Sequence, residues 1–345
     1  MINQDLTNRI EKDIYELTTL RGISSNEHSV AEVLADKLKN ICDCVEIDFN
    51  GNIIGFIKCS KNNPKILMLE AHMDRIGLMV SKIGDDGLVE FTSIGGIDKR
   101  VLPSAEVEIV GKDIVQGVIC VEKNKKDTNP DIEDMRIDTG FSVEYLRKNI
   151  KTGDMAFVKS SCTKLCGTVL SGPALDNRAG IAAVLSAIYD IDKAKLNYDI
   201  AILFSVQEEL GLHGAYTGTR SINPDVAIVI DVTHGETNDT KGETGVFQLG
   251  CGAVICRGPN FNSKYTRQLI DIAEDNSLPY DIEVASGPSG TTAWAIQITG
   301  KGVPSTLISI PLRYMHTNVE TLDLNDVSTC ALLMKKAIEG GIVLD

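Results

Sequence analysis

Ser205-Val206-Gln207-Glu208-Glu209-Leu210-Gly211 is the stretch that decides the fold. An apolar run over residues 200–206 ends there in two adjacent carboxylates and a glycine. This order predicts a buried strand whose carboxyl end carries two acids, and open α/β sheets bind their ligands outside the carboxyl ends of the strands. Side chains alternate along an extended chain, so Glu208 and Glu209 point in different directions. One of them can therefore hold a metal ion while the other faces a substrate.

Working outward from this stretch, strand-like and helix-like segments alternate. Apolar runs typical of buried strands recur at 65–69, 226–230 and 305–310, and apolar residues at helical spacing recur at 4–20, 179–189, 264–275 and 326–338. Alternating strands and helices predict a mostly parallel sheet covered by helices on both faces. Near the N-terminus, Ser24-x-x-Glu27 predicts a capping box that opens a second helix. Asn50-Gly51 predicts a tight hairpin turn between strands at 44–48 and 52–58.

The pattern changes after Asp74. Short strand-like runs separated by glycine-rich turns fill residues 76–120, a rhythm that fits a small β-barrel or sandwich. Residues 122–134 are polar and predict an exposed loop, and a short helix at 143–148 and a strand near 155–158 complete the segment. We therefore expect a β-rich domain over 75–165, inserted into an α/β domain formed by 1–74 and 166–345.

Bulk composition limits the class of protein. The chain has 345 residues, which predicts about two domains of typical size. Its formal net charge of −14 disfavours nucleic acid and anionic membranes, which are polyanions, as partners. No apolar run approaches the roughly 18 residues of a membrane helix, and the N-terminus lacks the layout of a secretory signal. Nine scattered cysteines, an odd number, favour reduced thiols in a cytoplasm over a disulfide framework.

Acids and imidazoles stand at several predicted strand ends or just before helices: His72 with Asp74, Asp176, Glu208 with Glu209, Asp231, and His316. Two histidines and several carboxylates at one sheet edge fit a centre of divalent metal ions. Imidazole suits Zn or Co, and carboxylates can bridge two ions roughly 3.5–4 Å apart. An acid two residues after His72 has a further use, because its carboxylate can accept the free imidazole N–H and fix the tautomer.

Each of these residues has an ordinary alternative when taken alone. A single strand-end acid is usually a turn or cap residue, and Glu208-Glu209 or His316 alone is compatible with a solvated loop. The joint pattern, not any one member, predicts the metal centre. His234 is a candidate for contacting the ligands, with a structural role as the favoured alternative, and His28 and His213 are expected to be structural. Cys162-x3-Cys166 matches half of a zinc site but lacks a second pair, so buried thiols are the favoured interpretation.

At these residues the sequence resembles the M42 family of dinuclear metallo-aminopeptidases, the glutamyl-aminopeptidase and tetrahedral-aminopeptidase group, some members of which carry an endoglucanase or cellulase M label. The matching stretches occur in family order and span most of the chain. They are Ala71-His72-Met73-Asp74, Gly95-Gly96-Ile97-Asp98-Lys99-Arg100-Val101-Leu102, Gly172-Pro173-Ala174-Leu175-Asp176-Asn177-Arg178-Ala179-Gly180, Val206-Gln207-Glu208-Glu209-Leu210-Gly211-Leu212, Asp231-Val232-Thr233-His234 and Arg313-Tyr314-Met315-His316.

The resemblance implies a role for each residue. Asp176 would bridge two metals, Glu209 and His316 would complete one site, and His72 and Asp231 the other. Glu208 would be the general base that activates a metal-bridged water, and Asp74 would orient His72. The implied fold is a phosphorylase/hydrolase-like mixed α/β sheet flanked by helices, with the inserted β-barrel serving dimer contacts and partly covering the site. The implied activity removes the N-terminal residue from short peptides with a free N-terminus, in a homo-oligomer that reaches a dodecamer built from dimers.

The sequence departs from the family at three places, none of them a predicted ligand. The family often has Gly-Thr-Asp-Ala where this chain has Gly290-Thr291-Thr292-Ala293, so an acid is missing at Thr292. The segment 235–242 lacks the usual short Pro-Gly ending, and the loop at 122–134 is shorter than usual. These departures concern substrate preference and catalytic efficiency.

Three other functions stay open from the sequence. A related dinuclear deacylase acting on N-acylated amino acids uses the same ligands, and a requirement for a free α-amine separates it from an aminopeptidase. An endoglucanase needs two carboxylates flanking a glycosidic bond, roughly 5–9.5 Å apart, and adjacent Glu208 and Glu209 cannot flank one. A non-catalytic, metal-stabilised scaffold is favoured only by the missing acid at Thr292.

Overall fold

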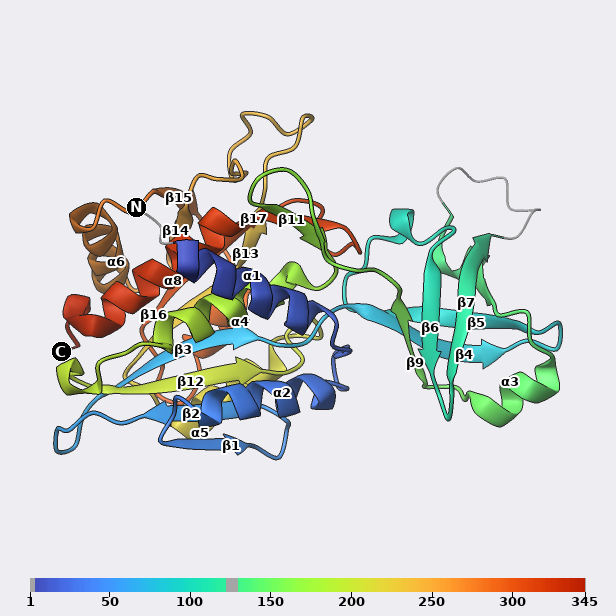
Figure 1. The fold of residues 1–345 in the computed structure, drawn as a ribbon, viewed down its shortest axis with the longest axis horizontal. Helices are drawn as coiled ribbons and strands as arrows, with labels where there is room; N and C mark the ends of the chain where they lie inside the picture. The colour runs from blue at the N-terminus through green and yellow to red at the C-terminus, as the bar shows by residue number, and fades with distance from the viewer. Residues whose placement is uncertain (1–3, 122–129, 345) are drawn as a thin grey trace.

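An eight-stranded mixed sheet forms the centre of the larger part of the molecule in the computed structural model, which describes residues 4–121 and 130–344 (Figure 1). In spatial order its strands are β1 (Cys44–Ile47), β2 (Ile53–Ile57), β12 (Asp199–Ser205), β3 (Ile66–His72), β13 (Val226–His234), β16 (Ser305–Leu312), β14 (Ala253–Arg257) and β15 (Tyr280–Val284). The four central strands β12, β3, β13 and β16 run parallel to one another. Their carboxyl ends therefore meet at one edge.

Helices cover both faces of this sheet, as the sequence predicts. One face packs against α1 (Gln4–Thr18), α2 (His28–Lys39), α4 (Leu175–Ile188), α6 (Ser263–Asp275) and α8 (Leu324–Lys336), and the other against α5 (His213–Ile222) and α7 (Thr292–Ile296). Because both faces are covered, the central strands read as continuous apolar runs, and all seven residues of β12 are buried. The predicted α/β fold class is confirmed.

A closed barrel forms the smaller part, at the right of Figure 1. Its strands pair in the order β4 (Gly77–Ile83), β5 (Leu88–Ile94), β8 (Met135–Asp138), β7 (Ile114–Val121), β6 (Glu106–Val110) and β9 (Met155–Val158), with α3 (Val143–Asn149) and the 3-10 turns η1 (Lys99–Val101) and η2 (Ile132–Asp134) beside them. Alternate residues such as Leu78, Val80, Val107 and Ile109 fill its interior. The predicted loop at 122–134 lies largely outside the described residues, and its end forms η2.

The remaining elements are short. A three-stranded sheet joins β10 (Thr163–Lys164), β11 (Val169–Gly172) and β17 (Glu320–Asp323), and two further turns are η3 (Lys193–Lys195) and η4 (Ala337–Gly341). In the described part of the chain, no helix has the length and apolar character needed to cross a membrane. The exact domain boundaries at 74/75 and 165/166, and the roles assigned to the two domains, stay a prediction.

Two local predictions need correction. The capping box at Ser24 is wrong: α2 begins at His28, Glu27 makes no side-chain cap bond, and the Ser24 hydroxyl donates to Asp74 instead. The hairpin between β1 and β2 forms, but its connection is longer than a two-residue turn because Ile47 pairs with Ile53. The Asp48 carboxylate closes that connection by accepting the N–H groups of Asn50 and Asn52.

Candidate metal centre

All five predicted metal ligands lie together at the carboxyl edge of the parallel strands. His72 is the last residue of β3, Asp231 lies in β13, and Glu209 follows β12. His316 follows β16, and Asp176 lies at the start of α4, where its backbone angles are not yet helical. These five residues come from segments separated by as much as 244 positions, and the topology of the sheet is what brings them to one place.

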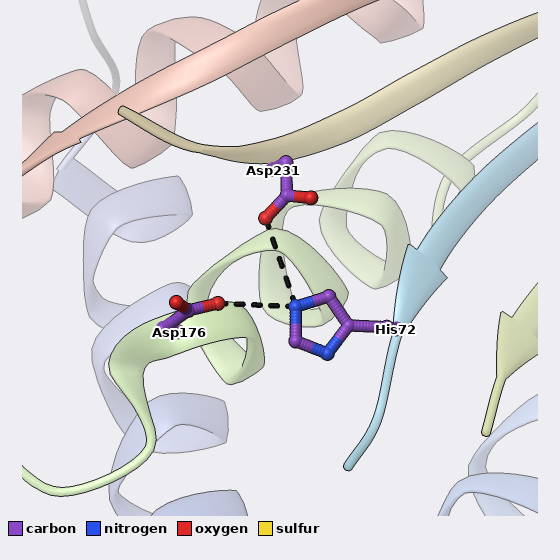
Figure 2. Close-up of side chains that lie close together, drawn as sticks. All are labelled: His72, Asp176 and Asp231. Carbon is purple, nitrogen blue, oxygen red and sulfur yellow. Dashed lines mark hydrogen bonds and ion pairs between the residues drawn. The ribbon is translucent and has the colours of Figure 1, made fainter. Parts of the chain in front are cut away.

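His72, Asp176 and Asp231 form the first group (Figure 2). The Nε2 atom of His72 lies 3.0 Å from Oδ1 of Asp176 and 3.7 Å from Oδ1 of Asp231. All three side chains are buried, and their ligand atoms lie within 4.8 Å of one another. Figure 2 shows the imidazole pointing from β3 towards both carboxylates, which reach it from α4 and β13.

Asp176, Glu209 and His316 form the second group, again with ligand atoms within 4.8 Å of one another. Nε2 of His316 lies 3.5 Å from Oδ2 of Asp176 and 3.4 Å from Oε2 of Glu209. Asp176 thus belongs to both groups and presents a different oxygen to each: Oδ1 faces His72 and Oδ2 faces His316. A carboxylate that offers one oxygen to each of two ligand groups has the geometry of a bridge between two cations.

The pKa values of the side chains at the carboxyl edge of the sheet are those of a site that can bind cations. Burial, followed by the nearby Asp176 charge, raises the pKa of Glu209 to about 8. Burial also raises the pKa of Asp231, against its contact with His72. The contact with Asp176 raises the pKa of His316 to about 9. Clustered acids destabilise one another in a low-dielectric site unless positive charge compensates them. Two imidazoles and three carboxylates are also a donor set that Zn and Co accept, so the residues present fit divalent ions.

Glu208 stands beside this cluster without belonging to either group. It lines the same pocket, and its pKa is raised well above the ordinary value, chiefly by burial and further by the charges of Asp231, Glu209 and Asp176. Its carboxylate is therefore a buried acid of the pocket lining that is not counted among the candidate metal ligands.

Asp74 anchors the backbone that carries the two glutamates. Its Oδ1 accepts the N–H of Glu208 at 2.9 Å, and its Oδ2 accepts the N–H of Glu209 at 3.2 Å and the hydroxyl of Ser24. Nδ1 of His72 is 3.4 Å from Oδ1 of Asp74, longer than an ordinary hydrogen bond. The predicted contact between Asp74 and His72 is therefore present but weaker than the contacts of Asp74 with the 208–209 backbone.

Sequence reasoning missed a second buried carboxylate with a similar task. Glu320, in β17, accepts the N–H of Asp176 through Oε2 at 3.1 Å and the N–H of His316 through Oε1 at 3.0 Å. It is 1% exposed, and burial raises its pKa to about 8. One side chain thus holds the backbone at two of the five candidate ligands. Its position four residues after His316, in a short strand that also carries the buried Leu322, is the signal for it in the sequence.

The barrel reaches the cluster through the segment after β5. The carbonyl of Gly96 lies 3.1 Å from Nδ1 of His316, and the N–H of Asp98 donates to the carbonyl of His316. A carbonyl at Nδ1 favours the tautomer whose Nε2 is free to bind a metal. Gly96 allows this approach, since a Cβ at that position would lie 3.0 Å from Nδ1.

The other residues singled out in the sequence lie elsewhere. His234 is exposed on the pocket wall, His213 contacts Gln207, and His28 pairs with Glu32. Cys162 and Cys166 are free thiols and belong to none of the metal-capable groups found in the described residues. Thr292 is buried and donates its hydroxyl to the buried carboxylate of Glu70. An acid at position 292 would instead place a second carboxylate against Glu70.

Comparison with known proteins gives a consistent result. The family model for the M42 glutamyl aminopeptidase matches residues 51–333. The lysyl aminopeptidase of Pyrococcus furiosus is 34% identical over 92% of this chain and 93% of its own length. The aminopeptidase of the archaeon Desulfurococcus kamchatkensis superposes with a TM-score of 0.91 at 33% identity, over 96% of this chain and 95% of its own. The Pyrococcus horikoshii TET1 peptidase, which can assemble into a tetrahedron or a large octahedral shell, superposes with a TM-score of 0.83 at 30% identity, over 95% of this chain and 99% of its own.

The match of the family model to most of the chain, the relatives of similar length and the shared architecture agree with the motifs at the sheet edge. The chain is therefore a member of the M42 peptidase family, and its activity class is that of an aminopeptidase.

Proposed function

We propose that this protein is a dinuclear metallo-aminopeptidase that removes the N-terminal residue from short peptides. His72 and Asp231 would hold one divalent ion, Glu209 and His316 would hold the other, and Asp176 would contribute one oxygen to each site. Zn or Co suits these ligands. The observation that carries the proposal is the position of Asp176, whose two oxygens face two separate groups, each containing an imidazole and a carboxylate.

The chain's own residues perform the proton transfers. Divalent cations held there would supply Lewis acidity, which makes a water molecule in the site more acidic and the scissile carbonyl more electrophilic. Glu208 accepts the proton of the attacking water and then donates it to the leaving amine. The raised pKa of Glu208, caused chiefly by burial, suits this exchange, because it strengthens the carboxylate as a proton acceptor. Asp74 keeps Glu208 in place by accepting the backbone N–H of Glu208.

The proposal also covers the part of the substrate that is recognised and the assembly of the protein. A free α-amine next to the cluster of carboxylates is the group that distinguishes a peptide N-terminus from an internal bond. The barrel, which contacts His316, supplies dimer contacts and part of the cover of the site. The protein acts in the cytoplasm as a homo-oligomer, and a dodecamer built from dimers is the expected assembly.

Activity on unblocked and blocked substrates tests this function. The protein, stripped with a chelator and reloaded with Zn or Co, is expected to hydrolyse aminoacyl p-nitroanilides and to leave their N-acetylated forms intact. The metal-free protein is expected to be inactive, and adding back either ion restores turnover. Cleavage of the acetylated forms in preference to the free ones would identify a deacylase, and bound metal without turnover on either would identify a scaffold. Cellulose hydrolysis that survives the chelator would identify an endoglucanase.

Glu320 provides a second test, through a residue that touches no ion. Glu320→Gln leaves one acceptor oxygen where two N–H groups need one each, so the backbone at Asp176 or His316 loses its partner. We expect metal affinity to fall roughly 10- to 100-fold, as for other partners of metal ligands. Titration with zinc in competition with a chromophoric chelator measures this change, and excess metal restores activity. Unchanged affinity in a folded variant would show that Glu320 does not position the ligands.

A further inference from the structure

The pocket at the metal centre extends well beyond the ligands. It has a volume of about 550 Å³ and runs from the cluster, across Leu307 and Ser309 of β16, to Cys256 of β14 and Glu283 of β15. Trp294 and Ala285 add apolar walls. β15 is three strands beyond β13 in the sheet, so roughly 14 Å separates their backbones at about 4.8 Å per strand. A pocket of this length accommodates an extended side chain of the residue whose peptide bond lies at the cluster.

Glu283 is the charged group at the far end of this pocket. It pairs in register with Cys256, whose thiol donates to Oε2 of Glu283 at 3.0 Å. Burial and the Glu283 charge raise the pKa of Cys256, so the thiol stays neutral and leaves the carboxylate charge uncompensated. Across residues 4–121 and 130–344, neither a lysine nor an arginine lines the pocket.

We propose that Glu283 makes this enzyme select peptides whose N-terminal residue is cationic, lysine or arginine; this inference rests on the proposed aminopeptidase function. The apolar walls contact the aliphatic stem of such a side chain, and its charged tip meets the carboxylate, the arrangement in which long basic side chains are usually buried. Opposite charges at the pocket end attract the substrate, and the hydrogen bonds between them are charge-assisted.

The same arrangement of Glu283 and the pocket walls weakens the binding of acidic and of neutral N-terminal side chains. An acidic side chain meets a like charge at Glu283 and finds no lysine or arginine partner in the described pocket lining. A neutral apolar side chain of the same length displaces water from the carboxylate without replacing its hydrogen bonds, which costs binding free energy. Discrimination between a cationic and a neutral side chain is therefore expected from Glu283 itself.

Lysyl and norleucyl p-nitroanilides test this specificity, because the two differ chiefly by an ammonium in place of a methyl group. For the metal-loaded enzyme we expect kcat/KM to favour lysyl by roughly 10- to 100-fold. Glu283→Gln keeps an acceptor for the Cys256 thiol and should remove most of this preference, and Glu283→Lys should shift it towards glutamyl p-nitroanilide. Asp281→Asn is the matched control, since it removes the same charge from the same strand at an exposed position outside the pocket lining.

A binding measurement separates this inference from the proposed function. Calorimetric titration of the metal-loaded protein with free L-lysine and L-norleucine needs no turnover, and lysine should bind more tightly to the wild type but not to Glu283→Gln. Lack of turnover on every p-nitroanilide would overturn the proposed function and leave this binding preference as the readout for Glu283. A lysine-to-norleucine ratio that is the same in the wild type and in Glu283→Gln, in binding or in kcat/KM, would overturn the inference.

Discussion

Glu208→Gln is expected to keep both metal ions and to lose roughly 10²–10⁴-fold in kcat. Glutamine has the shape of glutamate, and the backbone N–H at position 208 still donates to Asp74, so the site stays assembled. The amide cannot accept and return a proton, and the loss therefore falls on turnover rather than on metal content or folding. Elemental analysis and steady-state kinetics on the same sample measure the two quantities.

Glu209→Gln is the matched comparison for this variant. The two residues are neighbours, yet only Glu209 belongs to a metal-capable group. Its replacement is expected to lower the metal content as well as the activity, and excess metal should restore part of the activity. Near-normal turnover of Glu208→Gln, or loss of metal in it, would show that the base is another residue.

The second large effect concerns the number of ions bound. Asp176→Ala removes the carboxylate shared by the two groups, so both ions and all activity are expected to be lost. Asp231→Ala removes a member of the first group alone and leaves Asp176, Glu209 and His316 in place. We therefore expect about one ion per subunit in Asp231→Ala and none in Asp176→Ala after dialysis against metal-free buffer. Equal metal content in the two variants would contradict the bridging role of Asp176.

The convergence of the five candidate ligands could be predicted from sequence for a simple physical reason. Buried parallel strands are recognisable as apolar runs, and their carboxyl ends share an edge, so His72, Asp231 and the 208–209 pair had to meet. Asp176 and His316 were placed less directly, since neither ends a strand: one precedes a predicted helix, the other follows the strand at 305–310, and the family resemblance supplied the role of each. The barrel followed from short strands and frequent turns, although periodicity alone did not separate it from a sandwich.

The supporting contacts could not be predicted, because they use backbone groups. Glu320 accepts two backbone N–H groups, and Glu27 accepts those of Ser25 and Gln207. Such contacts impose no spacing on the sequence. The failure at Ser24 has the same origin: serine suits a helix cap and an acid partner equally well, and only the fold shows that Asp74 lies closer. The position of Glu283 depends on how β14 and β15 pair, which is a long-range property.

The Gly96 carbonyl and the Asp98 N–H connect the segment after β5 of the barrel to His316, one of the five candidate ligands. Two backbone groups of the barrel domain thus contact His316, so a rotation of the barrel relative to the sheet would also move the imidazole ring. Under the proposed function, a second subunit that binds the barrel is expected to change how firmly His316 holds its metal ion. Assembly of the proposed oligomer and retention of the proposed metal ions are then expected to depend on each other through this contact.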